Sequence, residues 1–245
     1  MSAAENSDST QVVIKSAGLP DWKKEDLKEV SLYQMKISPP CVKIRAILQY
    51  HGVPFKQING KKPKDNYKKV PVLMLNDYQI NDSFQMVVDL APILHGAKLS
   101  EEDIAFEKQM AYGFQVACVR GNLENGWNMR LTMGKWCGCA GANFLTFCCC
   151  NCPCYRSHAL NNMKKAGVQV KHSDIWKYLT IIEERLGDNQ YLAGDKIGIL
   201  DLSLYGMTHT FSAKPAHGFF QEMLDKSEKF SKWWMRMYEA VGVVN

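Results

Sequence analysis

The clearest chemical pattern in the chain is Ser38-Pro39-Pro40-Cys41. It follows a short apolar stretch and precedes apolar residues at helical spacing, so we expect a helix to begin here with Ser38 as its N-cap. Prolines suit the first turn, where a missing N–H has no cost. The free N–H groups and the dipole of a helix start stabilise an anion by about 0.3–2 kcal/mol. Taken alone, however, Ser38 is more simply a helix cap, and Cys41 fits a half-buried thiol as well as a redox group.

Two further pieces lie downstream. Val70-Pro71 opens an apolar stretch typical of a central strand, where proline is unusual because it cannot donate a hydrogen bond to a neighbouring strand. Asp82-Ser83 precedes a second helical pattern, and by itself it is an ordinary cap. A carboxylate beside a hydroxyl at a helix start also suits a zwitterionic α-amino acid. The amino group would pair with Asp82, and the carboxylate would accept hydrogen bonds from Ser83 and the helix N–H groups.

Hydrophobic patterning indicates the elements that hold these residues in place. Strands are expected at 30–35, 53–58, 70–75 and 78–80, with helices at about 39–51 and 84–95. This order of elements is that of an α/β thioredoxin (glutaredoxin-like) domain. In thioredoxin-like domains the proline that opens the third strand is cis and exposes the backbone of the preceding residue. We therefore expect a cis Val70-Pro71 bond.

The remainder of the chain has a different pattern. After residue 100 no strand pattern recurs, and apolar residues return only at helical spacing. We divide the 245 residues into a polar N-terminal tail at 1–28 that packs loosely, a thioredoxin/glutaredoxin-like domain at 29–96, and an all-α domain at 97–245.

Together these pieces resemble a known family. Leu32-Tyr33-Gln34, the helix start at 38–45, Val70-Pro71 and Asn81-Asp82-Ser83 are similar to the glutaredoxin-like domain of the membrane-associated prostaglandin E synthase type 2 family, within the glutathione transferase superfamily. That family carries Cys-Pro-Phe-Cys, whose last cysteine matches Cys41 and whose first falls on Ser38; a tyrosine near its active site falls on Met35. The resemblance implies that glutathione is the ligand and that its contacts are Pro40, Cys41, Val70, Pro71, Asp82 and Ser83.

Ser38 changes the chemistry that such a site can perform. Dithiol exchange needs an attacking thiolate and a resolving thiol, so the altered motif excludes two-thiol redox chemistry. Serine-type glutathione transferases place a catalytic serine at this helix start, where its hydroxyl donates a hydrogen bond to the glutathione sulfur and lowers the sulfur's pKa. Two hypotheses stay open: a transferase or isomerase in which Ser38 and Cys41 are the catalytic candidates, or a silent, substrate-binding or purely structural relic.

The second domain carries a folding motif. Asp201 falls on the acidic position of the capping box that starts the core helix of transferase C-terminal domains, whereas Gly198 stands where the family has a hydroxyl residue. By this resemblance Asp201 stabilises the fold and takes no part in catalysis.

Seven of the nine cysteines lie between residues 137 and 154. Four thiolates can hold zinc, but the spacing differs from the common Cys-x2-Cys pairs, and we predict no metal. A palmitoylated or interfacial membrane segment is a second interpretation. Small apolar cysteines within a helical hairpin or a protein interface are the third.

Composition limits the partners and the compartment. A net charge of +5 is too mild for a nucleic-acid-binding protein, and the polar N-terminus lacks a secretory signal, which predicts an intracellular location. The six histidines are scattered and give no support for haem. Membrane-associated or mitochondrial placement is one hypothesis and the cytoplasm the alternative. As partners we expect glutathione, a membrane surface or protein complex contacted through 137–154, and a homodimer; the non-catalytic alternative is an accessory subunit of a membrane-associated, mitochondrial assembly.

Overall fold

The structure is a computed structural model that describes residues 19–60, 67–124, 153–212 and 218–244. The cysteine-rich segment therefore lies outside the described residues as far as residue 152, and the side chain of Cys154 is also outside them. No helix among the residues that are described is long and apolar enough to cross a bilayer.

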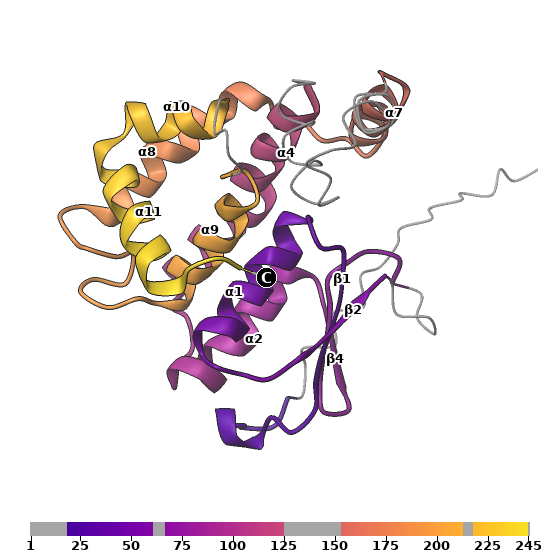
Figure 1. The fold of residues 1–245 in the computed structure, drawn as a ribbon, viewed down its shortest axis with the longest axis vertical. Helices are drawn as coiled ribbons and strands as arrows, with labels where there is room; N and C mark the ends of the chain where they lie inside the picture. Colours follow the sequence, from indigo (N-terminus) through magenta and orange to yellow (C-terminus); the bar gives the residue numbers. More distant parts are fainter. Residues whose placement is uncertain (1–18, 61–66, 125–152, 213–217, 245) are drawn as a thin grey trace, which may run out of the picture.

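The first domain is a four-stranded mixed sheet with two helices. The strands stand in the order β2-β1-β3-β4; β1 and β2 are parallel, and the other pairs are antiparallel. Helices α1 and α2 lie between the sheet and the helices of the second domain (Figure 1). The bounds are β1 Val30–Gln34, α1 Pro39–Tyr50, β2 Lys56–Asn59, β3 Val72–Leu75, β4 Tyr78–Asn81 and α2 Ser83–His95. The predicted thioredoxin-type domain is confirmed.

Two strands begin later than predicted. The second starts at Lys56 rather than at residue 53, because Pro54 has no N–H for the ladder with β1. The third starts at Val72, directly after the proline that opens the apolar stretch. Both differences arise from proline.

The segment before β1 is better packed than predicted. Leu27 is buried, and the ring of Trp22 lies edge-on to Tyr78 at 5.1 Å between centroids. The Asn76 side-chain oxygen accepts hydrogen bonds from the N–H groups of Lys28 and Glu29. The expected loose packing thus does not extend to residue 28, because apolar and turn residues anchor this end to the sheet.

The second domain is built of helices and connecting loops over its described residues, as predicted, with one isolated β-bridge between Tyr191 and Gly194. Its elements are α3 Glu101–Gln109, the π-helical turn η2 Met110–Phe114, α4 Gln115–Glu124, α7 Pro153–Lys165, η3 His172–Asp174, α8 Ile175–Leu186, α9 Ile199–His209, α10 Phe219–Lys226 and α11 Glu228–Val241. Helix α9 is buried along its whole length and packs against α1, which joins the two domains.

The contact between α1 and α9 is very close. A Cβ atom added to Gly206 would lie 2.5 Å from the Cα of Lys43, so only glycine fits at this crossing. Beside it, the buried Lys43 Nζ lies 2.7 Å from Oε1 of Glu107 on α3, and Ser203 Oγ donates to Oε2 of Glu107 at 2.8 Å. One buried ion pair and one hydroxyl therefore connect α1, α3 and α9.

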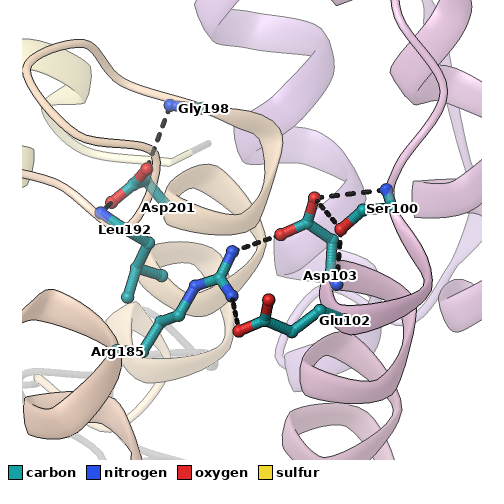
Figure 2. Close-up of polar contacts among 7 residues, drawn as sticks. All are labelled: Ser100, Glu102, Asp103, Arg185, Leu192, Gly198 and Asp201. Carbon is teal, nitrogen blue, oxygen red and sulfur yellow. Dashed lines mark hydrogen bonds and ion pairs between the residues drawn. The ribbon is translucent and has the colours of Figure 1, made fainter.

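Acidic side chains organise the helix starts of the second domain (Figure 2). Asp103 accepts a hydrogen bond from the Ser100 backbone at the start of α3 and forms an ion pair with Arg185 of α8. Asp201 accepts from the N–H groups of Gly198 at 3.0 Å and Leu192 at 2.8 Å. The Asp201 half of the α9 capping box is thus formed, and Gly198 supplies no hydroxyl for the other half.

Candidate functional site

The pieces singled out in the sequence meet at one end of the sheet. Val72 pairs with Tyr33 of β1 on one side and with Asn81 of β4 on the other. The end of β1, the start of β3 and the end of β4 are therefore adjacent. Because α1 follows β1 and α2 follows β4, both helix starts and the Val70-Pro71 bond converge on this end. That bond is cis, as predicted.

Ser38 occupies the N-cap position of α1, but its side chain does not cap the helix. The carbonyl of Ser38 accepts the N–H groups of Cys41 and Val42, at 2.8 and 2.9 Å. Its hydroxyl is instead hydrogen-bonded to the Cys41 thiol, and the residue is 8% exposed. The predicted N-cap position of Ser38 is therefore confirmed, but its hydroxyl contacts the Cys41 sulfur and makes no cap hydrogen bond.

Cys41 is fully buried on the first turn of α1, not half-buried. Burial raises the pKa of its thiol; the Met35 backbone, the Ser38 hydroxyl and the charge of Arg45 act in the opposite direction and only partly compensate. A thiol in this state stays protonated at neutral pH and is a poor nucleophile. Through its hydrogen bond with Ser38, the thiol helps to fix the position of the Ser38 hydroxyl.

Arg45 is a buried cation one helical turn beyond Cys41. It donates to the side-chain oxygen of Gln34 at 2.5 Å and to the carbonyl of Lys36 at 2.7 Å, and both acceptors are neutral. Its Nε has no hydrogen-bond partner among the described residues. Burial lowers the pKa of the guanidinium, which nevertheless stays charged at neutral pH. Arg45 therefore adds positive potential to that of the helix dipole beneath the start of α1.

Asp82 caps α2 from a left-handed backbone conformation, with φ 70°. Its carboxylate accepts the N–H of Phe84 at 2.9 Å. The next residue, Ser83, is the first of α2 and is buried. A carboxylate, a hydroxyl and free helix N–H groups thus lie together, as the α-amino-acid hypothesis requires.

Two tyrosines that the sequence analysis missed converge on Asp82. The Tyr112 hydroxyl is hydrogen-bonded to the Asp82 carboxylate, and its ring lies 5.7 Å from that of Phe84. The Tyr67 hydroxyl is hydrogen-bonded to the Asp82 backbone. Burial and the charge of Asp82 raise the pKa of Tyr67 to about 12 and also raise the pKa of Tyr112. Both phenols are therefore neutral at physiological pH; Tyr112 donates to the Asp82 carboxylate, whereas the Tyr67 oxygen accepts from the Asp82 backbone N–H.

Tyr112 comes from the second domain. It lies in the middle of η2, a π-helical turn of the kind often found at functional sites. Its local sequence resembles any amphipathic helix, so only the packing of the two domains reveals its contact with Asp82.

Asp201 lies away from this group. Its contacts are Leu192, Gly198 and Trp233, whose Nε1 donates to Oδ1 at 2.8 Å. Burial raises the pKa of Asp201, and these hydrogen bonds counteract that effect. A cavity of about 920 Å³ also lies elsewhere, between the end of α2, α3 and α8, where Arg185 bridges Asp103 and Glu102 (Figure 2).

Family models match both domains. Residues 32–92 match the model described as glutathione S-transferase, N-terminal domain, and residues 147–240 match glutathione S-transferase, C-terminal domain. The two matches together cover more than half of the chain. They follow the same division that the fold shows.

Curated relatives match the first domain most clearly. A segment of 65 residues is 43% identical to prostaglandin E synthase 2 of Danio rerio, covering 24% of this chain and 17% of the relative. A segment of 92 residues is 30% identical to prostaglandin E synthase 2 of Mus musculus, covering 34% of this chain and 24% of the relative. The similarity therefore spans less than a quarter of each relative.

Solved structures match nearly the whole chain. An apo glutathione S-transferase III has a TM-score of 0.56 at 15% identity, over 88% of this chain and 97% of its own. A variant of human glutathione S-transferase T1-1 has a TM-score of 0.56 at 16% identity, over 87% of this chain and 84% of its own. Glutathione S-transferase I bound with lactoylglutathione has a TM-score of 0.53 at 17% identity, over 87% of this chain and 96% of its own. At these identities the matches establish the fold.

Proposed function

The chain belongs to the glutathione transferase superfamily, in which it resembles prostaglandin E synthase 2, and we propose that it binds glutathione at the end of the sheet. One observation supports this most strongly: the Ser38 helix start, the cis Val70-Pro71 bond and Asp82-Ser83 are separate in sequence but meet at one place. Each supplies a different group that a γ-glutamyl tripeptide needs.

Different residues would bind different parts of glutathione. Asp82 would pair with the γ-glutamyl ammonium, while the Ser83 hydroxyl and the N–H groups of α2 would hold the α-carboxylate. The backbone of Val70, before the cis proline, would bind the cysteinyl backbone. Pro40 would contact the ligand at the start of α1, whereas Cys41, the other contact that the resemblance implies, is fully buried and offers it no surface. Tyr112 already bonds to the Asp82 carboxylate, so it would have to release that carboxylate or share it.

Ser38 would then act on the ligand's sulfur. Its hydroxyl would turn from the Cys41 thiol and donate to the glutathione sulfur, which lowers the pKa of that sulfur. The thiol proton passes to water, and the thiolate attacks an electrophile and forms a C–S bond as the leaving group departs. The dipole of α1 and the charge of Arg45 would stabilise the thiolate. Glutathione is then the only reacting thiol, and no resolving cysteine is needed.

Calorimetry with glutathione and a thiol-conjugation assay test this function. Micromolar to low-millimolar binding is expected. Ser38→Ala should keep that binding and lower kcat by about 10²–10³-fold, the usual loss for a donor at a developing anion. Ser31→Ala on β1 is the matched control and should be neutral. Unchanged turnover in Ser38→Ala would remove Ser38 from the mechanism, and undetectable glutathione binding would refute the site.

A second candidate function is a non-catalytic accessory subunit of a membrane-associated, mitochondrial assembly. The observation in its favour is that the polar groups satisfy one another: Tyr112 bonds to Asp82, and Ser38 bonds to Cys41. Absence of glutathione binding together with migration in a large native complex is the expected result for this function. A lone monomer or homodimer in native extracts would overturn it.

A further inference from the structure

Two histidines from different helices face each other at close range. His51 follows α1 as its C-cap, and His95 is the last residue of α2. Their Nε2 atoms lie 3.0 Å apart, and the ring planes are nearly perpendicular at 85°. One nitrogen must donate a proton to the other to form this hydrogen bond. A metal ion that accepts both lone pairs can replace that proton.

The separation of the two nitrogens is short enough for both to bind one metal ion. At metal–nitrogen distances of about 2.0–2.1 Å, two ligands at a right angle lie about 2.9 Å apart, and two tetrahedral ligands lie about 3.3 Å apart. The observed 3.0 Å lies close to both values, and imidazole nitrogens suit divalent transition metals such as Cu²⁺ and Ni²⁺. We propose that His51 and His95 form a binding site for a divalent transition metal of this class.

Most of the groups around the two histidines favour a bound cation, and one opposes it. Both imidazoles lie at helix C-termini, whose negative dipole ends attract a cation. Burial, together with His95 and Lys24, lowers the pKa of His51 to about 4, and burial lowers the pKa of His95. The Lys24 ammonium opposes the metal charge and weakens the site.

The ligand set predicts a weak and exchangeable site. Over the described ranges, no three or more His, Cys, Asp or Glu residues cluster around a metal position. Two imidazoles would thus supply the protein ligands, and water would complete the shell. This arrangement differs from a closed structural zinc site, which uses four protein ligands.

The site is independent of the proposed glutathione function. Helix α1 starts at the candidate site and ends beside His51, and α2 likewise ends at His95. Each helix runs for about 18–20 Å at 1.5 Å per residue. The two helices lie side by side (Figure 1). Metal binding at the far ends can be measured whether or not glutathione binds.

Calorimetric titration of the full chain with Ni²⁺ at pH 7.5 tests the proposal. The thiols are first blocked with N-ethylmaleimide, so that metal bound by free cysteines cannot add to the signal. We expect a dissociation constant on the order of 10–100 µM, weakened about tenfold or more in His95→Ala and His51→Ala. His158→Ala, an exposed histidine on α7, is the control and should bind like the unmodified sequence.

Two outcomes would overturn the proposal: no Ni²⁺ binding by the unmodified sequence, or equal binding by His95→Ala. His95 is exposed, so this variant decides the question even if His51→Ala fails to fold. Cu²⁺ bound to the same blocked chain should show two coordinating nitrogens by electron paramagnetic resonance, and one or none in His95→Ala.

Discussion

Replacing Glu107 by glutamine would leave the buried Lys43 ammonium without its counter-charge. In the folded chain the two groups are 2.7 Å apart, with 0% and 1% of their side chains exposed. An amide of the same size can still accept a hydrogen bond from Lys43 through its oxygen and can donate its N–H to the Ser203 hydroxyl, so the substitution removes charge with little change of shape. Breaking a buried pair by removing one partner costs about 3–5 kcal/mol.

That loss is large for this chain. A domain is usually stable by only about 5–15 kcal/mol. For a chain of this length, each kcal/mol lowers the Tm by roughly 2–4 °C, so Glu107→Gln should lower the Tm by roughly 6–20 °C. The loss should appear as reduced cooperation between domains, because Lys43 belongs to α1 and Glu107 to α3.

A compensated variant separates charge from packing. Lys43→Met with Glu107→Leu and Ser203→Ala removes the pair and the hydroxyl that depends on it. Replacing a buried pair by apolar residues of similar volume is often neutral or stabilising by about 1–4 kcal/mol, so this variant should recover most of the lost Tm. Glu222→Gln breaks an exposed pair with Lys226 and should cost no more than about 1 kcal/mol.

Thermal melts followed by near-ultraviolet circular dichroism measure these effects. A Glu107→Gln shift no larger than that of Glu222→Gln would refute the argument that the Lys43 charge is confined between the domains. If the triple variant were less stable than Glu107→Gln, the pair would stabilise the fold through its packing and not through its charge.

Two further predictions concern the α2 side of the molecule. Tyr112→Phe frees the Asp82 carboxylate, and we expect glutathione to bind about tenfold more tightly by calorimetry; equal or weaker binding would mean that the hydroxyl assists the ligand. Burial raises the pKa of Asp89 to about 6, and Oδ2 has no hydrogen-bond partner in the described part of the chain. The folded state therefore holds this proton more tightly than the unfolded state, so stability falls as pH rises from about 4 to 6. Solvent screening of this partly exposed carboxyl limits that fall to about 1–2 kcal/mol. Asp89→Asn should remove it in denaturant titrations at both pH values, and a parallel fall in the variant would contradict this.

The sequence was sufficient to predict those site residues whose roles depend on their near neighbours in the chain. A hydroxyl and two prolines at a helix start, a proline that opens a strand, and a carboxylate before a helix each have a chemical reason within a few residues. The order of strands and helices then brought Ser38, Val70-Pro71 and Asp82 to one place. The fold and these positions could be predicted together for that reason.

Contacts between distant segments could not be predicted in this way. Tyr112 meets Asp82 only after the second domain folds against the first, and nothing in its own helix indicates this. Lys43 and Arg45 are basic residues on a helix, usually a sign of solvent exposure, yet both are buried because α9 and β1 supply their surroundings. His51 and His95 are 44 residues apart and were expected to be unrelated.

The close crossing of Gly206 and Lys43 also divides α1 into a part fixed by packing and a part that is not. The middle of α1 is fixed by backbone contact with α9, where any side chain larger than hydrogen would collide. The first turn, which carries Ser38 and Cys41, lies outside this crossing and depends on its own hydrogen bonds. Substitutions at the helix start can therefore alter the chemistry of this end of the sheet while the domains stay joined.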